Sequence, residues 1–238
     1  MSGIKKQVGD WYPLLAPIVS SVRFKEVITY IQTCKARGKV IYPDTKMTFR
    51  AFKMCPLSKI RVVILGQDPY HDGSANGLAF ANNEDTLRIS PSLRQLTKAI
   101  EHDYKDTLCV DFDYTLEAWA AQGVLLLNTA LTVEKGSAGS HLEVWRGFTR
   151  SFLKALSSQR SNIIYVLWGK KAQFYSQYIT GNNVVIAPHP AADLYSGKKE
   201  FETSGTFREI NSLLANPIKW NVRAEEFTPR EIPGKPPF

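Results

Sequence analysis

The sequence has few cysteines, few histidines and no long apolar run. Its 238 residues include three cysteines and four histidines. Cys34, Cys55 and Cys109 are widely spaced without a C-x-x-C pair, so their spacing indicates neither a disulfide framework nor a zinc or iron–sulfur site. A membrane span would need about 18 consecutive apolar residues, and the N-terminus lacks the apolar stretch of a signal peptide. We therefore expect a soluble, unsecreted protein of a reducing compartment.

What the sequence does contain fits a globular protein with an excess of positive charge. Hydrophobic residues make up 44% and aromatic residues 11%, which excludes a disordered or fibrous class. The 30 Lys and Arg against 22 Asp and Glu give a net charge of +8, which favours an anionic partner such as nucleic acid without proving one. We expect a single domain over 1–238, with an extended, proline-containing tail at about 225–238.

Short apolar runs alternate with segments of helical spacing. The runs are rich in Val, Ile and Leu and hardly alternate, as in strands buried on both faces of a parallel sheet. They are RVVILG (61–66), GVLLLN (123–128), IIYVLWG (163–169) and NVVIAPHP (183–190). Helical spacing occurs in 23–38, 92–100, 144–156 and 203–217. The alternation predicts an α/β layer sandwich.

Polar and aromatic side chains follow each of the predicted strands. Gln67, Asp68, Tyr70 and His71 follow the first, Asn128 ends the second, Gly169 and Lys170 follow the third, and His189 follows the fourth. In open α/β sheets, ligands bind beyond the carboxyl ends of the strands. The sequence therefore predicts that these groups meet in one cleft.

Each of these side chains also has a simpler interpretation. Asp68 precedes a proline, so its carboxylate either caps the next segment or polarises a water molecule. A metal site of Asp68, His71 and His189 is an alternative, but the sequence has neither the H-x-x-x-H nor the H-x-H spacing that would support it. His189 is either a structural histidine or one whose ring is directed into a site, since the prolines before and after it restrain its backbone. An Asn128 amide suits the edge of a nucleobase, and Phe80 is either core or a stacking platform.

Four motifs in this order resemble those of the family 1 uracil-DNA glycosylases. They are GQDPYH, LLLN, VLWG and HP, and the resemblance covers about residues 42–220. It implies a three-layer α/β sandwich with a central four-stranded, mostly parallel sheet flanked by helices. It also implies an enzyme of base excision repair that flips uracil out of DNA and hydrolyses its bond to deoxyribose, without a metal or cofactor. An abasic site is the product.

The resemblance assigns a role to each side chain of the predicted cleft. Asp68 would orient a water molecule and stabilise the sugar cation, and a neutral His189 would donate to uracil O2. Asn128 would read uracil N3–H and O4. Phe80 would stack on the base, and Tyr70 would exclude the methyl group of thymine.

Further residues match the parts of the family that complete the pocket and contact DNA. Gln67 would shape the pocket largely through its backbone, and His71 matches the histidine next to the water site. The SPSL segment (90–93) resembles the end of the family's proline-rich loop, with Pro91 in it and Ser92 at its phosphate-contacting serine.

The second loop departs from the family pattern. It reads HPAADLYSGKKEF, so Ala191 lacks the usual serine hydroxyl, and only its backbone N–H could meet a phosphate. Asp193 occupies the usual place of the leucine that wedges into DNA, and an aspartate suits this poorly. We therefore expect Leu194 as the wedge, with Tyr195 as the alternative. Lys170 replaces a usual serine and would add a phosphate contact.

Two classes of function follow from these motifs. The first is an active glycosylase on uracil-containing single- and double-stranded DNA, acting as a monomer in the cytoplasm, or in the nucleus of a eukaryotic host. The second is a noncatalytic DNA-binding or polymerase-associated module, which only the altered loop favours. HPAAD also occurs in poxvirus glycosylases that double as polymerase processivity partners, although these lack an intact GQDPYH. A protein inhibitor or a polymerase remains open as a partner.

Overall fold

The fold is built on a central sheet of four parallel strands. The computed structural model describes residues 2–105 and 107–223, and the predicted tail at 225–238 lies outside them. The strands are β2 (Val62–Gly66), β3 (Val124–Asn128), β5 (Ile164–Trp168) and β6 (Asn183–Ala187), in the order β3-β2-β5-β6. Each neighbouring pair is parallel. The predicted sheet and its four strands are therefore confirmed.

Three of the strands are buried on both faces and one is not. Every residue of β2, β3 and β5 is buried, which explains their unbroken apolar runs. β6 lies at the edge of the sheet, and its Ile186 side chain is 57% exposed. The expectation of burial on both faces was thus wrong for β6, one face of which is left uncovered at Ile186, whereas β3 at the opposite edge is buried throughout.

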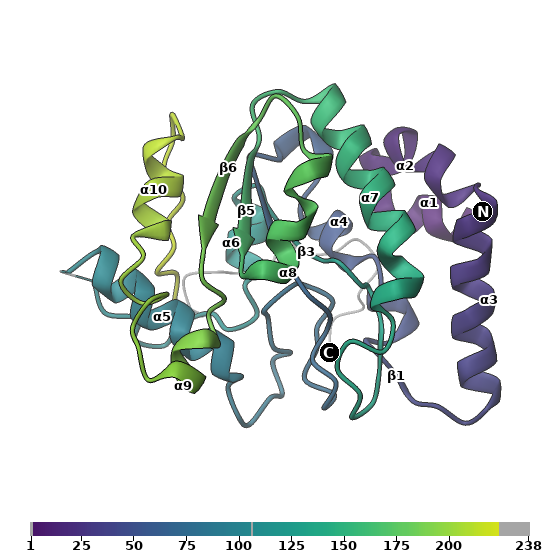
Figure 1. The fold of residues 1–238 in the computed structure, drawn as a ribbon, viewed down its shortest axis with the longest axis horizontal. Helices are drawn as coiled ribbons and strands as arrows, with labels where there is room; N and C mark the ends of the chain where they lie inside the picture. Colours follow the sequence, from purple (N-terminus) through teal and green to yellow (C-terminus); the bar gives the residue numbers. More distant parts are fainter. Residues whose placement is uncertain (1, 106, 224–238) are drawn as a thin grey trace, which may run out of the picture.

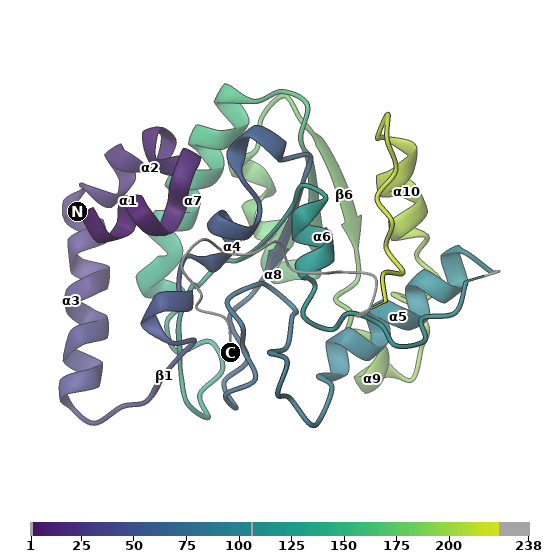
Figure 2. The ribbon, with the colours of Figure 1, turned by 180° about the vertical axis from the view of Figure 1, so that it is seen from behind.

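Helices cover both faces of the sheet. In Figure 1, α7 (Leu142–Gln159) and α8 (Lys170–Gln173) lie in front of the strands. From behind, α4 (Arg50–Met54) and α6 (Glu117–Ala121) come to the front (Figure 2). Beyond β6, α5 (Pro91–Asp103) and α10 (Thr206–Ser212) lie side by side in both views. The resulting three layers match the expected sandwich.

The N-terminal region forms three helices that pack on the α7 side of the molecule. They are α1 (Ser2–Val8), α2 (Tyr12–Val19) and α3 (Val22–Ala36). The helix predicted at 23–38 is α3, which begins where the Ser21 hydroxyl accepts a hydrogen bond from the Phe24 N–H at 3.2 Å. The Phe24 ring then packs edge-on against Trp145 of α7, 6.2 Å between centroids. Aromatic packing therefore fixes this helix to the core.

Short elements complete the described chain. Strands β1 (Ile41–Tyr42) and β4 (Val133–Glu134) form a two-stranded antiparallel sheet that sequence patterns did not predict, since two residues are too few to show a period. The others are α9 (Ala192–Ser196) and the 3₁₀ helices Gly9–Trp11, Thr45–Met47, Leu57–Lys59 and Phe174–Tyr178. Over residues 2–105 and 107–223, no helix has the length and apolar character needed to cross a membrane.

Candidate active site

A cavity of about 160 Å³ opens where the strands end. The strand ends are in register, since Gly66 of β2 pairs with Asn128 of β3 and Trp168 of β5 pairs with Ala187 of β6. The cavity is lined by Gln67, Asp68, Pro69, Tyr70, His71, Leu78, Phe80, Ser92, Asn128 and His189. The structure thus brings together all six residues expected to act in catalysis or uracil binding, as the strand-end argument predicts.

Glycines at two strand ends allow the polar side chains to come close. A Cβ atom on Gly66 would lie 2.2 Å from Oδ1 of Asn128. A Cβ atom on Gly169 would lie 2.7 Å from Cβ of His189, and the φ of +83° at Gly169 already disfavours any other residue. These two glycines therefore set the positions of Asn128 and His189 beside the cavity.

The Asp68 carboxylate lies at the cavity wall and is held by a loop from elsewhere in the chain. The backbone N–H of Gly139 donates a hydrogen bond to Asp68 Oδ2 at 2.5 Å. Burial raises the pKa of Asp68, and the Gly139 hydrogen bond and the positive charge of Lys171 oppose this rise. A partly buried carboxylate that the Gly139 N–H holds in place at the cavity wall suits the orientation of a water molecule.

The hydrogen bonds of His189 determine which ring nitrogen carries its proton. The Ala191 N–H donates to Nδ1 of His189 at 3.1 Å, so Nδ1 is an acceptor. Burial, followed by the charge of Lys171, lowers the pKa of His189, which favours the neutral ring. A neutral imidazole with an accepting Nδ1 carries its proton on Nε2. His189 is therefore a neutral donor at the cavity.

The aromatic side chains of the cavity are positioned by backbone contacts. Phe80 has a φ of +66°, a conformation that costs free energy for a bulky residue. Its ring lies 6.0 Å from that of His189 and 5.5 Å from that of Trp168. The Tyr70 hydroxyl donates to the Phe80 carbonyl at 3.0 Å, and burial raises the pKa of Tyr70. The two aromatic residues are thereby joined at the cavity wall.

The Asn128 amide is buried at the cavity without a partner of its own. The side chain is 6% exposed, and no other residue of the described chain forms a hydrogen bond with its amide group. A buried amide normally has both its donor and its acceptor paired. Both functions of this amide are therefore left for a molecule in the cavity.

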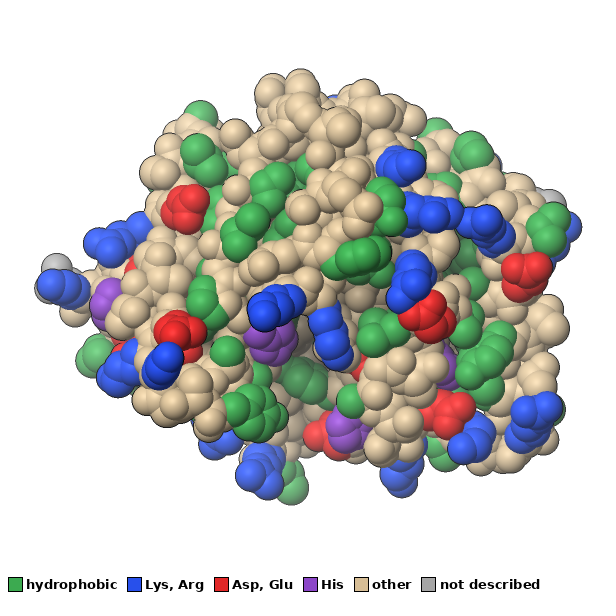
Figure 3. Space-filling model, viewed as in Figure 1, with side chains coloured by type: hydrophobic (Ala, Val, Ile, Leu, Met, Phe, Trp, Pro, Cys, Tyr) green, Lys and Arg blue, Asp and Glu red, His purple; other side chains and the backbone are tan. Residues whose placement is uncertain are grey.

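Some of the residues predicted to contact DNA line the cavity, and others lie exposed outside it. Ser92 is 9% exposed and lines the cavity, whereas Pro91 is exposed at the start of α5. Lys170 is exposed and does not line the cavity. The neighbouring Lys171 is the lysine whose charge acts on both Asp68 and His189. In Figure 3, Lys and Arg side chains gather around a hollow whose wall includes a histidine.

The loop after His189 differs from its expected arrangement. The Ala191 N–H, expected to meet a phosphate, is instead occupied by His189 Nδ1, because the turn after Pro190 folds it back onto the ring. The Asp193 carboxylate is buried and accepts from the N–H groups of Phe201 and Glu202, both at 2.9 Å. Asp193 thus closes the loop at its base, with its carboxylate turned inward.

Two side chains of this loop project outward. Leu194 is 45% exposed and Tyr195 is 89% exposed, and both belong to α9. An apolar side chain on an exposed turn beside a cavity is the kind that inserts between bases. The structure leaves both residues as candidates for this role.

Comparison with known proteins identifies the family. A model of the Uracil DNA glycosylase superfamily matches residues 52–215. The chain belongs to this superfamily. Its uracil-DNA glycosylase relatives include those of Proteus mirabilis strain HI4320, 37% identical over 89% of this chain and 96% of the relative, and of Dichelobacter nodosus strain VCS1703A, 40% identical over 90% and 94%.

Solved structures of uracil-DNA glycosylases share the fold. The crystal structure of the mimivirus enzyme superposes with a TM-score of 0.80 at 23% identity, covering 89% of this chain and 86% of that one. The mimivirus Y322L variant in complex with UGI has a TM-score of 0.81 at 22% identity, covering 89% and 88%. The α/β sandwich around the cavity is thus the architecture of uracil-DNA glycosylases.

Three residues of the glycosylase site were missed by the motifs. Gly139 lies 71 positions from Asp68, in a loop with no family motif. Lys171 follows the lysine that was predicted, and it acts on Asp68 and His189 through its charge without lining the cavity. Leu78 lines the cavity two positions before Phe80. Of these three positions, only Gly139, in the segment SAGS, carried a sequence signal, because glycine is typical of turns.

Proposed function

We infer that this protein is a uracil-DNA glycosylase, which hydrolyses the N-glycosidic bond between uracil and deoxyribose in DNA and leaves an abasic site for base excision repair. Relatives of that name and structural likeness to such enzymes support this function. The observation that carries it is the neutral imidazole of His189, with its Nε2–H free, on the same cavity as the Asp68 carboxylate.

The two groups suit the two charges that develop when the bond breaks. As the bond between uracil N1 and the sugar C1′ lengthens, positive charge grows on the sugar and negative charge on the uracil. Asp68 stabilises the sugar cation and orients the water molecule that adds to C1′, while His189 donates from Nε2 to uracil O2. The water proton passes to solvent and no metal takes part.

Uracil is selected by the remaining side chains of the cavity. The unpartnered Asn128 amide accepts from uracil N3–H and donates to O4. Phe80 stacks on the ring, and Tyr70, held by the Phe80 carbonyl, occupies the space that a thymine methyl group would need. Gln67 completes the wall. These assignments are supported by the shared cavity and by the family motifs.

Contacts with DNA extend from the rim of the cavity. His71, Ser92 and Pro91 flank one side, and the exposed Lys170 and its neighbour Lys171 supply positive charge on the other. Phosphate contacts and an inserted side chain offset the few kcal/mol needed to extrude the base. We assign the wedge to Leu194, with Tyr195 as the alternative, and assign no phosphate contact to the occupied Ala191 N–H.

The decisive experiment is uracil excision from a defined oligonucleotide. Single- and double-stranded substrates with one uracil are incubated with the protein in EDTA, and abasic sites are detected by alkaline cleavage. We expect abasic product from both substrates and none from the thymine-containing control. A noncatalytic DNA-binding module, favoured by the altered loop, would bind the same oligonucleotides without product, and that outcome would contradict the glycosylase assignment.

The oligomeric state, compartment and partners of the enzyme are part of the same proposal. We propose one glycosylase domain over the chain, acting as a monomer, because DNA must approach the cavity from the open loop side. Such an enzyme would work where DNA is held, in the cytoplasm of a bacterium such as Proteus mirabilis, which has a similar protein, or in a nucleus. Because the mimivirus enzyme forms a complex with UGI, we also propose a protein inhibitor of that kind as a partner. A polymerase partner has support only from the HPAAD loop.

A further inference from the structure

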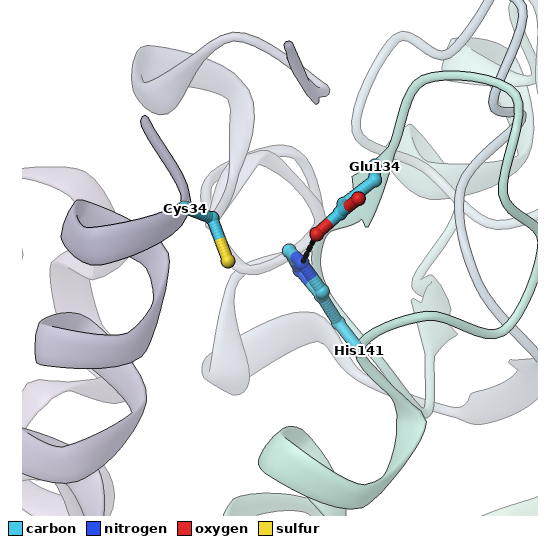
Figure 4. Close-up of side chains that lie close together, drawn as sticks. All are labelled: Cys34, Glu134 and His141. Atoms are coloured by element: carbon cyan, nitrogen blue, oxygen red, sulfur yellow. Dashed lines mark ion pairs between the residues drawn. The ribbon is translucent and has the colours of Figure 1, made fainter. Parts of the chain in front are cut away.

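A second cluster of reactive side chains lies outside the uracil cavity. Cys34 of α3, Glu134 of β4 and His141, which precedes α7, point toward one another from three elements (Figure 4). One sulfur, one oxygen and one nitrogen atom of these side chains lie within 4.8 Å of one another. None of the three lines the uracil cavity. The cluster therefore requires an explanation separate from glycosidic bond cleavage.

His141 faces the cluster with an unpartnered nitrogen. Its side chain is 0% exposed, and its Nε2 has no hydrogen-bond partner. The other nitrogen, Nδ1, lies 2.8 Å from the hydroxyl of Thr132, which accepts from the Trp145 indole N–H at 2.7 Å. A metal-binding histidine is usually oriented in this way, through a hydrogen bond at its second nitrogen. A buried nitrogen without a partner is costly unless something binds it.

The remaining side chains present suitable donors. The Glu134 carboxylate lies 4.0 Å from His141 Nε2 through Oε1, while Oε2 accepts from Lys39 at 3.1 Å. The Tyr30 ring covers the imidazole edge-on at 5.4 Å. The cluster is thus shielded on this side and holds a sulfur, an oxygen and a nitrogen donor close together.

We propose that Cys34, Glu134 and His141 bind one zinc ion. A thiolate, an imidazole and a carboxylate are the ligand types zinc takes, and a water molecule would complete a tetrahedron. Binding releases the Cys34 thiol proton to solvent, and the thiolate and carboxylate then neutralise the two charges of the ion. Tetrahedral ligands lie about 3.3–3.7 Å apart at zinc bond lengths, so the side chains need to close by about 1 Å.

The zinc site would brace the loop that supports the catalytic carboxylate. Its ligands Glu134 and His141 flank this loop, whose Gly139 N–H donates to Asp68 at 2.5 Å. The Gly136 N–H of the same loop donates to the His71 carbonyl at 2.9 Å. An ion that joins both ends of the loop to α3 would restrict its motion without touching the substrate. The proposed role is therefore structural, and excision continues in EDTA.

The test measures metal binding directly. The full chain is stripped with EDTA, dialysed and titrated with zinc chloride against a chromophoric zinc chelator, and with cobalt chloride by absorption spectroscopy. We expect one equivalent of zinc, a thiolate-to-cobalt charge-transfer band, and a higher unfolding temperature with zinc. The Cys34→Ser variant should lose the band and at least about tenfold in zinc affinity. Cys109→Ser, which removes a cysteine outside the cluster, should behave as wild type.

A second variant keeps the test valid if Cys34→Ser does not fold. Glu134→Gln preserves the shape of the side chain and should also weaken zinc binding, while magnesium chloride should bind to no variant. The proposal is overturned if wild-type protein binds zinc no more tightly than either variant, or if its cobalt spectrum lacks the thiolate band. These results do not depend on uracil excision, so they stand apart from the glycosylase assay.

Discussion

The backbone N–H of Ala191 donates a hydrogen bond to Nδ1 of His189 at 3.1 Å. Only Pro190 separates the two residues, so a short turn of backbone decides the tautomer of the imidazole. A ring that accepts at Nδ1 and is neutral can only donate from Nε2. Ala191, which stands where the family has a serine, therefore fixes the tautomer of His189 with its backbone N–H alone.

The charge of Lys171 should set the acid limit of activity. Lys171 lowers the pKa of both Asp68 and His189, and catalysis needs the deprotonated form of each. Lys171→Met therefore raises both pKa values, and activity is lost at a higher pH as the pH falls. We expect a shift below about one pH unit, since an exposed charge is screened. Single-turnover rates from pH 4 to 8 measure it, with Lys170→Met as the control that should not move the limit.

Replacing the Asp68 carboxylate should separate activity from stability. Asp68→Asn should lower the excision rate about 10²–10³-fold, because the sugar cation loses its counter-charge. Burial raises the pKa of Asp68 in the folded state, so its contribution to stability is present at low pH and lost as the pH rises through that pKa. The variant should therefore unfold at a higher temperature than wild type at pH 7, where 1 kcal/mol corresponds to about 2–4 °C, and equally at pH 3. A lower unfolding temperature at pH 7 would contradict this account.

The unpartnered Asn128 amide should determine the choice of base. Asn128→Asp replaces the NH₂ donor by an acceptor, which suits the amino group of cytosine better than uracil O4. Uracil excision should fall about 10- to 100-fold, for one mismatched buried hydrogen bond of about 1–3 kcal/mol, and cytosine excision should become detectable. Competition between uracil and cytosine oligonucleotides measures the ratio, and an unchanged ratio would exclude Asn128 as the reader.

The close approach of Gly169 to His189 gives a prediction with a matched control. Gly169→Ala places a Cβ atom 2.7 Å from Cβ of His189 at a φ of +83°, so the fold should lose about 1–3 kcal/mol and the imidazole should move. Gly181→Ala has a comparable φ of +66° with nothing within 4 Å. Both variants should destabilise the fold, but only Gly169→Ala should slow excision in single-turnover assays of folded protein. Equal excision rates would show that the contact does not position His189.

The wedge assignment can be tested by comparing substrates. Leu194→Ala should slow excision from duplex about 10-fold or more and leave single-stranded DNA nearly unaffected, since only the duplex must be opened and its stacking replaced, at about 1–3 kcal/mol per base. Tyr195→Ala serves as the comparison on the same turn of α9. If Tyr195→Ala shows the duplex-specific loss and Leu194→Ala does not, the wedge is Tyr195.

The sheet and the meeting of side chains at its edge could be predicted from the sequence. Buried parallel strands show as continuous apolar runs, and their carboxyl ends share one edge, so Asp68, Asn128 and His189 had to converge. The exposure of β6 was less predictable, because its run is as apolar as the others while Ile186 is exposed. Whether other elements cover both faces of a strand depends on tertiary packing, which local patterns do not contain.

Contacts between distant loops could not be predicted. The Gly139 N–H reaches Asp68 only because the loop after β4 folds over the end of β2, and no pattern near Gly139 indicates this. Cys34 lies about a hundred positions from Glu134, so spacing rules for metal ligands do not apply to their cluster. The hydrogen bond from the Ala191 N–H to His189 depends on the geometry of the turn between them. The prolines on either side of His189 restrict this geometry but do not determine it.

The absence of room between Gly66 and Asn128 has an evolutionary consequence. With Oδ1 of Asn128 only 2.2 Å from where a Cβ atom would be, no single substitution at position 66 can be accommodated while the amide stays in place. A lineage that drifts toward another base can change position 128, but position 66 gains no freedom from that change, because Cβ of Ala79 lies 2.8 Å from the same point. Two interatomic distances thus keep position 66 a glycine along any such path.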